Sequence, residues 1–495
     1  MSHFLNNRLA RLENHLKAEN PALLEVLPTY YTFDKLLYRT GLLDKESSLA
    51  SRISWWPLIS VLGTFSSGKS TFINTYVGDK LQSTGNQAVD DKFTVICHRT
   101  ATTAGSQTLP GTALDADPRF PFFRISHEIE KVAQGEGKHI ESYLQLRTTG
   151  NDRIKSKIII DSPGFDADDQ RRSTLRITDH IIDLSDLVLV FFDARHPEPG
   201  AMQDTLEHLV ARTVKRTDAS KFLYVLNQID TAAKDDNAEE IVGAWQRAVA
   251  QAGLAAGQFY TIYNEDAATP IEDKAQKERF QKKRDADLAK IITRMDEVEL
   301  QRNYRIVSVL ETVANELEHD ILPKLRKAKA SWRRGVLIGD GIALAALIAV
   351  IAGLMFYFKW MPPMQVFSLD WIVNHKIDVG ASILAAIVLV GSFHLWVRGV
   401  VAKRIAKPMS RAYGQVELNL RAAFEKSTSA VHSVFGTEPA GWGGRAAKKL
   451  RVVRETVANH IQSLNDRYAD PSGRSAIIQE QATISEPVVK AEAPK

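Results

Sequence analysis

Residues 57–71 decide the fold, and they are Pro-Leu-Ile-Ser-Val-Leu-Gly-Thr-Phe-Ser-Ser-Gly-Lys-Ser-Thr. A short apolar run ends at Gly63, and the pattern Gly63-x-x-x-x-Gly68-Lys69-Ser70 follows at once. Glycines at these positions let backbone N–H groups point at phosphate oxygens, and the helix predicted to follow adds its positive N-terminal end. The pattern therefore predicts a phosphate-binding loop between a strand and a helix, with a plain glycine turn as the alternative.

The polar residues of this loop have predicted roles. The Lys69 ammonium would reach the β- and γ-phosphates and is the predicted catalytic cation, and the Ser70 hydroxyl would hold Mg²⁺. The predicted nucleotide contacts in this stretch are Gly63, Ser66, Ser67, Gly68, Lys69, Ser70 and Thr71.

Length and composition set the broad class. The 495 residues are 44% hydrophobic and 25% charged, which is ordinary globular material with room for two or three domains. A net charge of +4 gives no general reason to expect a nucleic-acid partner. The single cysteine, Cys97, excludes an internal disulfide and favours a reducing compartment. The first eight residues lack an apolar core, so no signal peptide is predicted there.

Short β-rich runs alternate with helical stretches between residues 51 and 270, which predicts a doubly wound, mostly parallel α/β sheet. Several of these runs are apolar without alternation, as expected of strands buried on both faces. The predicted strands are Leu58–Leu62, Phe93–Cys97, Ile158–Ile160, Leu187–Phe192, Phe222–Leu226 and Phe259–Tyr263. Ligands of such sheets bind at the carboxyl ends of the strands, so partners of the loop are expected there.

An acidic residue ends one of these strands. Asp161-Ser162-Pro163-Gly164 follows the run Ile158–Ile160. Asp161 can hold Mg²⁺ through water, and the Gly164 N–H can contact the γ-phosphate. Alone this is a plain turn, but behind a buried strand and downstream of a phosphate loop the functional interpretation is favoured.

A second strand end carries a base-reading pattern. Asn227-Gln228-Ile229-Asp230 occupies the place of the Asn-Lys-x-Asp motif of GTPases. The Asp230 carboxylate can accept two hydrogen bonds from guanine, from N1–H and from the exocyclic amine, which adenine cannot match. Gln228 replaces the usual lysine. The pattern predicts GTP as the nucleotide, with a strand-end turn as the alternative.

The segment that closes over the γ-phosphate is expected within residues 84–94. Thr94 is the predicted threonine on the Mg²⁺ side, and Thr84 and Asp90 are the alternatives. The predicted metal contacts are therefore Ser70, Thr94 and Asp161.

Together these motifs resemble the dynamin superfamily of large GTPases, over roughly residues 20–270. The more specific parts are Ser66–Thr71 and the proline of Asp161–Gly164. Residues 91–98, 191–195 and 223–230 are similar to the EH-domain-containing branch. That branch has paired threonines in switch I, where this chain has Val89-Asp90. It also binds ATP, so an ATPase of similar architecture is an alternative.

The residue after Asp161-x-x-Gly164 is relevant to how the attacking water is oriented in catalysis. Ras-like GTPases place a water-orienting glutamine there, whereas this chain has Phe165. Water must then be oriented by other groups, and we predict that these are the backbone near Ser66 and Ser67 and the switch elements. The resemblance implies that pairing of two G domains supplies this ordering. Arg171 and Arg172 could add charge stabilisation or be solvated surface residues.

Two apolar segments, Gly335–Phe358 and Ile377–Val397, are each long enough to span a hydrocarbon core of roughly 30 Å. A buried globular hairpin is the alternative. Basic residues are frequent before the first segment and after the second, and only Lys359 and Lys376 lie between them. The positive-inside rule then predicts a multi-pass membrane protein with both soluble arms cytoplasmic, and the layout favours a bacterial inner membrane.

Small residues in the two segments would let the spans approach closely. They form Gly335-x-x-x-Gly339, Ala381-x-x-x-Ala385 and Ser382-x-x-x-Ala386. Asp340 and His394 fall at a similar depth when the hairpin is drawn, so either they pair or each is solvated at the interface.

Apolar stripes at helical spacing predict helices over 275–332, 413–435 and 445–466. The predicted order of domains is N-terminal helices (1–50), a dynamin-type G domain (51–270), a helical stalk arm (271–334), the transmembrane hairpin (335–398), a C-terminal helical arm (399–468) and a disordered tail (469–495).

The sequence thus predicts a membrane-anchored, dynamin-like GTPase that uses GTP and Mg²⁺. The resemblance implies self-association through G domains, coupled to tethering, fusing or reshaping a lipid bilayer. A membrane-bound, GTP-dependent switch that recruits a partner is the alternative from another functional class.

Overall fold

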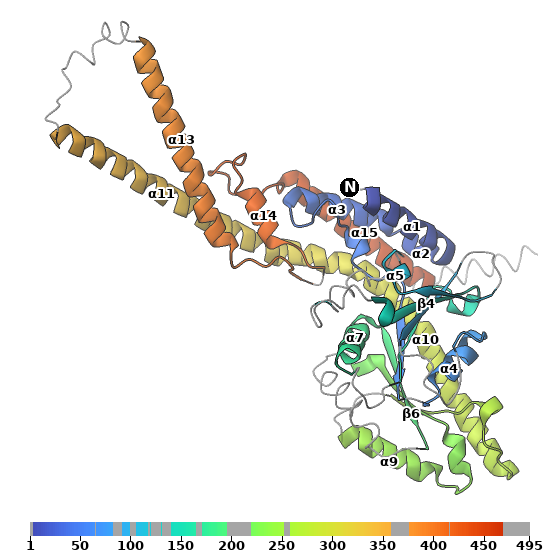
Figure 1. Cartoon of the computed structure of the whole chain (residues 1–495). Helices are drawn as coiled ribbons and strands as arrows, with labels where there is room; N and C mark the ends of the chain where they lie inside the picture. Colours follow the sequence, from blue (N-terminus) through green and yellow to red (C-terminus); the bar gives the residue numbers. More distant parts are fainter. Residues whose placement is uncertain are drawn as a thin grey trace, which may run out of the picture. The chain divides into compact units, whose positions relative to one another are not determined.

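A computed structural model describes residues 3–64, 66–82, 92–99, 105–116, 119, 130, 140–164, 171–195, 219–251, 258–357, 376–414 and 416–468. The chain divides into two compact units (Figure 1). The sheet unit contains His3–Leu27, Ser51–Val307 and Ile461–Lys495, and the helical unit contains Pro28–Ala50 and Ser308–His460. The predicted tail from 469 and the loop 358–375 lie outside the described residues.

The sheet has eight strands in the part of the chain that the structure describes. They are β1 (Leu58–Gly63), β2 (Phe93–His98), β3 (Gln107–Pro110), β4 (Leu144–Thr149), β5 (Ile158–Asp161), β6 (Leu187–Asp193), β7 (Phe222–Asn227) and β8 (Gln258–Thr261). Their order is β3-β4-β2-β5-β1-β6-β7-β8. The five strands from β5 to β8 run parallel, β2 runs antiparallel to β5 and parallel to β4, and β3 is antiparallel to β4. The predicted mostly parallel sheet is confirmed.

Helices cover both faces of the sheet (Figure 1), which explains why strands such as β1 and β6 are buried at every position. The helices of this unit are α1 (His3–Glu19), α2 (Pro21–Leu24), α4 (Lys69–Val77), α5 (Thr112–Ala116), α7 (Arg171–Leu184), α9 (Ala238–Gln251) and most of α10 (Lys274–Glu316). On one face α9 contributes Trp245, whose ring lies 5.4 Å from that of Phe192. On the other face Ile73 of α4 and Met295 of α10 share a second core. Short 3₁₀ turns occur at Leu49–Ser51, Ile140–Ser142, Asp152–Ile154, Ala219–Lys221, Ile229–Ala233 and Glu265–Ala267.

The helical unit is built on α3 (Leu27–Thr40), a π-helical turn (Leu317–Ile321), α11 (Leu322–Tyr357), α13 (Lys376–Ala406), α14 (Leu420–Ser427) and α15 (Gly444–Tyr468). The predicted stripe before the apolar segment is confirmed, since its members are all at most 2% exposed: Leu310, Val313, Leu317, Ile321 and Leu325.

One predicted helix is much shorter than expected. The prediction covered 413–435, whereas α14 ends at Ser427 and Val431 is 91% exposed. The Asn419 side chain caps the start of α14 by accepting from the Ala422 N–H at 2.9 Å. At the other end, the Thr428 hydroxyl donates to the Phe424 carbonyl at 3.0 Å, and such local side-chain bonds compete with continuation of a helix.

Helices α11 and α13 contact each other near the start of the apolar stretch. A Cβ on Gly335 would lie 2.8 Å from Val401, and one on Gly339 would lie 2.7 Å from Val397. The predicted close approach at the two glycines is confirmed. Ala381 and Ala385 are exposed instead, because the two helices diverge away from this contact (Figure 1).

Large apolar side chains are exposed along both helices. On α11 they are Leu337, Ile338, Ile342, Leu344, Leu347, Ile348, Val350, Ile351, Phe356 and Tyr357. On α13 they are Leu384, Ile387, Val388, Leu389, Val390, Phe393, Leu395, Trp396 and Val400. Among the described residues, one helical run, Lys274–Tyr357, is long and apolar enough to cross a membrane. The second predicted span, Ile377–Val397, is not supported by this finding and stays a prediction from the sequence.

The predicted pair between the two helices is confirmed. His394 Nδ1 lies 2.7 Å from Asp340 Oδ2, and both side chains are about one-third exposed. The pair joins α11 to α13 within one helical turn of the Gly339 contact.

Replacing Asp340 with asparagine is expected to destabilise the hairpin by removing the charge that faces His394. We expect a loss on the order of 1 kcal/mol, or roughly 2–4 °C in the melting temperature in detergent. Glu455→Gln, at an exposed carboxylate on α15, is the matched control. Equal melting temperatures for Asp340→Asn and the parent protein would show that the pair contributes nothing.

Candidate nucleotide-binding site

The predicted strand–loop–helix arrangement is present between β1 and α4. Gly68 precedes the first residue of α4 with φ +85°, and a Cβ there would lie 2.1 Å from Asn227 Nδ2. A Cβ on Gly63 would lie 2.4 Å from the Phe191 carbonyl oxygen. Both positions therefore favour glycine, Gly68 for its left-handed backbone and the nearby Asn227 side chain, and Gly63 for the close approach of the β6 backbone.

The Lys69 side chain extends back over the phosphate loop that precedes it. Its ammonium donates to the carbonyls of Gly63 at 3.0 Å and Thr64 at 2.9 Å, and the residue is 7% exposed. The Ser67 hydroxyl also donates to the Thr64 carbonyl, at 2.7 Å. The cation is thus held over the loop, in the place where phosphate oxygens would lie in the predicted complex.

Asp161 and Ser70 lie together, as the motifs predict. Asp161 ends β5 and is 4% exposed, and its Oδ2 accepts from Ser70 Oγ at 3.4 Å and from Gln82 Nε2 at 2.7 Å. A hydroxyl and a carboxylate are oxygen ligands of the kind that Mg²⁺ takes alongside waters and nucleotide phosphates. The residues therefore fit a magnesium ion bound with the nucleotide. Among the described residues, no group of three or more His, Cys, Asp or Glu is placed to hold a metal by itself.

Gln82 was not predicted from the sequence. Its backbone is fixed by Asn74 of α4, whose side-chain oxygen accepts from the N–H groups of Leu81 and Gln82 at 2.8 Å each. Its amide oxygen accepts from Arg147 of β4 at 2.5 Å. No motif marks Gln82, so only the fold shows that it positions the Asp161 carboxylate.

Thr94 lies beside Asp161, but inside a strand. The two residues face each other across the antiparallel pair β2–β5, and Thr94 is 1% exposed. Its hydroxyl accepts from Gln145 Nε2 at 2.8 Å. A metal role for Thr94 stays a prediction, and the alternatives Thr84 and Asp90 lie outside the described residues, as does Phe165.

The base-reading residues lie beside the phosphate loop. Asn227 Nδ2 donates to the Ser67 carbonyl at 2.9 Å, and Gln228 Nε2 donates to the Ser66 carbonyl at 2.6 Å. Asp230 is 5% exposed, and its Oδ2 accepts from the Thr269 N–H at 2.7 Å. The structure therefore brings the end of β7 to the loop that follows β1, as predicted for a shared site.

A further pair at this edge was not assigned to the site from the sequence. Asp193 ends β6 opposite Asn227, and both of its oxygens accept from Arg195, at 2.6–3.0 Å. Arg195 also donates to the Ser66 carbonyl at 3.4 Å. The hydrogen bonds and charge of Asp193 raise the pKa of the Arg195 guanidinium. The signal was an acidic residue at the end of a buried strand, the same signal that marks Asp161.

The remaining predicted residues occupy consistent places. Thr71 lies in the first turn of α4 and is half-buried, and Gly164 follows the end of β5. Arg171 and Arg172 begin α7.

Residues 59–229, which span β1 to the end of β7, match the family model described as the dynamin family. This part of the chain is similar to the dynamin family. The match includes the phosphate loop, Asp161 and Asn227. The similarity to the EH-domain-containing branch stays a prediction.

Two solved structures align with most of this chain, and both are described as an oligomerised bacterial dynamin pair that provides a mechanism for the long-range sensing and tethering of membranes. The first is 12% identical with a TM-score of 0.32, and the alignment covers 97% of this chain and 78% of the other. The second is 14% identical with a TM-score of 0.31 and covers 92% and 79%. Scores at this level support no conclusion about this chain. No curated protein matches it.

Proposed function

We propose that this chain is a membrane-anchored GTPase that hydrolyses GTP with Mg²⁺ and couples pairing of its G domains to tethering, fusion or remodelling of a lipid bilayer. The observation that carries the proposal is the helical run Lys274–Tyr357. It begins beyond β8 of the nucleotide-binding sheet and ends in an exposed apolar stretch. One chain therefore joins a phosphate loop to a segment suited to lipid.

The predicted chemistry uses groups that already lie together. Lys69 would exchange its two loop carbonyls for phosphate oxygens, and Ser70 and Asp161 would hold Mg²⁺. The ion, when bound, neutralises charge that develops on the β- and γ-phosphates. Backbone groups of Ser66 and Ser67 would orient water, and both loop residues are held by side chains from β7 and its turn.

Guanine selectivity is expected to depend on Asp230, whose carboxylate is held by a hydrogen bond from the Thr269 N–H. Asp230→Asn removes the acceptor pair that guanine requires, and we expect the ratio of GTP to ATP affinity to fall roughly 10- to 100-fold. Fluorescent-nucleotide titrations with both bases measure this ratio. Asp235→Asn, at an exposed carboxylate five residues along, is the control, and an unchanged ratio in Asp230→Asn would reject the base-reading role.

The proposed anchor is a two-span hairpin formed by α11 and α13. The helices contact each other at Gly335 and Gly339, share the Asp340–His394 pair and expose apolar side chains along their lengths. Basic residues flank both outer ends, so the positive-inside rule predicts that both soluble arms are cytoplasmic, and a bacterial inner membrane is the proposed location.

The test is nucleotide turnover per molecule in liposomes at rising protein density, with GTP and ATP side by side. Turnover that rises with density for GTP only is the result expected from pairing of G domains. A slow GTP rate that does not depend on density would favour a regulatory switch that recruits a partner. Preference for ATP would reject the base-reading interpretation and leave the phosphate loop intact.

A further inference from the structure

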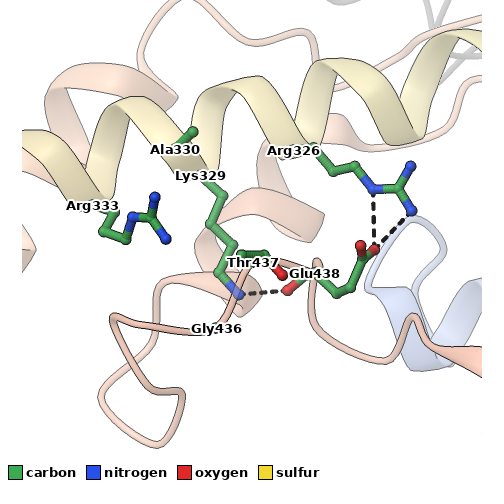
Figure 2. Close-up of a pocket in the computed structure, with 7 residues that line it drawn as sticks. All are labelled: Arg326, Lys329, Ala330, Arg333, Gly436, Thr437 and Glu438. Atoms are coloured by element: carbon green, nitrogen blue, oxygen red, sulfur yellow. Dashed lines mark hydrogen bonds and ion pairs between the residues drawn. The ribbon is translucent and has the colours of Figure 1, made fainter.

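A small cavity lies at the foot of the apolar stretch of α11. Arg326, Lys329, Ala330 and Arg333 line it from α11, at the spacing that places residues on one helix face. The segment from Gly436 to Glu438 closes the other side (Figure 2). Its volume is about 220 Å³, which is enough for a phosphate group.

One of the three cations in this cavity is already neutralised. The Arg326 guanidinium donates twice to Glu438 Oε2, at 3.1 and 2.9 Å. The cavity therefore contains three cationic side chains and one carboxylate, and that carboxylate already forms an ion pair with Arg326. The surplus positive charge belongs to Lys329 and Arg333.

Lys329 is a buried cation whose positive charge is only weakly balanced by neighbouring negative charge. It is 4% exposed, and its ammonium donates to the backbone carbonyl of Glu438. Burial lowers the pKa of Lys329, and this effect outweighs the attraction of the Glu438 charge. An ammonium removed from water in this way gains stability from an anion placed beside it.

Arg333 is half-buried and has no hydrogen-bond or ion-pair partner among the residues that the structure describes. Figure 2 shows its guanidinium on the same side of α11 as the Lys329 ammonium. Thr437, which can donate from its hydroxyl, lines the same space. A guanidinium, an ammonium and a hydroxyl are the donors that recognise a phosphate.

The position of the cavity along α11 indicates where the phosphate comes from. Leu337 and Ile338 follow Arg333 by about one turn and are 46% and 62% exposed, so the apolar face begins roughly 6–8 Å along the axis from the cavity. A headgroup phosphate lies at about this distance from the hydrocarbon core. Acyl chains could then extend along the exposed face of α11.

We propose that this cavity binds the phosphate of an anionic phospholipid, through Lys329 and Arg333. The proposal rests on the membrane insertion of the hairpin, which is part of the proposed function. It adds a lipid-headgroup site to the anchor and predicts a preference for anionic over zwitterionic lipid.

The test uses the purified full-length protein in neutral detergent, titrated with dihexanoyl-phosphatidylglycerol. The same titration with dihexanoyl-phosphatidylcholine and with inorganic phosphate shows whether the lipid or free phosphate is the ligand. We expect saturable binding of the anionic lipid, weakened about tenfold or more by Arg333→Gln. Arg334→Gln, at the exposed neighbour outside the cavity, is expected to change the affinity less than twofold.

A second variant blocks the cavity without changing its charge. A Cβ on Gly436 would lie 3.5 Å from Lys329 Nζ, in ordinary contact, so Gly436→Leu would extend into the space that the phosphate needs. Its loss of lipid binding, with an unchanged melting temperature, would support the site. Equal weakening by Arg333→Gln and Arg334→Gln would overturn it in favour of a general surface charge, and so would binding of inorganic phosphate as tight as that of the lipid.

Membrane insertion is measured separately, by flotation of the protein with phosphatidylcholine vesicles after carbonate washing. Failure of the parent protein to float would reject the anchor and, with it, the headgroup site. Normal flotation with anionic-lipid affinity unchanged in Arg333→Gln would reject the site alone.

Discussion

GTP turnover by Lys69→Ala is expected to fall by roughly 10²- to 10³-fold, the typical cost of removing one preorganised group that stabilises transition-state charge. The ammonium is the cation that lies over the phosphate loop, held by the carbonyls of Gly63 and Thr64. In the predicted complex it faces the β- and γ-phosphates, where negative charge develops during transfer. The loss should therefore appear mainly in kcat, measured as phosphate release at saturating GTP.

Two controls separate this effect from damage to the fold. Lys80→Ala removes an exposed lysine just beyond α4 and should leave turnover unchanged. Urea unfolding of Lys69→Ala should show a stable sheet, because the neighbouring core residues Phe72 and Ile73 are untouched. A stable Lys69→Ala protein that hydrolyses GTP at the parent rate would refute the assignment of this loop to catalysis.

The second large effect is expected for the double variant Leu344→Arg/Ile348→Arg. Both side chains lie in the apolar stretch of α11 and are 58% and 59% exposed. An arginine at the centre of a membrane-spanning helix costs roughly 2.5–3.5 kcal/mol on insertion scales, so two should abolish stable insertion. Resistance to carbonate extraction measures the outcome.

Val452→Arg is the matched control for this variant. Val452 lies on α15 and is 47% exposed, so the substitution adds charge at an exposed apolar position outside the predicted hairpin. It should leave carbonate resistance unchanged. A double variant that stays in the membrane as firmly as Val452→Arg would mean that α11 does not enter the hydrocarbon core.

The apolar strands and the phosphate loop were predictable because their signals are local. Strands such as β1 and β6 are buried at every position and therefore form continuous apolar runs. By contrast, β3 is exposed at all four positions and β4 alternates apolar residues with Gln145 and Arg147, so neither gave such a run. These two strands lie at the edge of the sheet and next to it, where strand formation depends on pairing with distant neighbours that the local pattern does not record.

The residues of the site also divide into those with a local sequence signal and those without one. Gly63, Gly68 and Lys69 are linked by fixed spacing in one loop, and the sequence identifies them together. Gln82 and Arg195 reach the site through the folded chain, by bonds to Asp161 and to the Ser66 carbonyl. Hydrogen bonds between segments that are far apart in sequence leave no periodic trace, so Gln82 could be found only in the structure, whereas Arg195 follows an acidic strand end that the sequence does contain.

The π-helical turn at Leu317–Ile321 affects the direction in which the side chains of α11 point. A π turn holds one residue more than an α turn, and each α-helical residue advances the direction of a side chain by about 100°. The turn therefore sets the angular phase between Leu310 before it and Trp332 after it. Deletion of the exposed His319, which removes one residue from this turn, is expected to change the direction of the α11 side chains relative to Leu310 by about 100°. The turn thus sets the direction in which Arg333 and the apolar stretch face relative to Leu310.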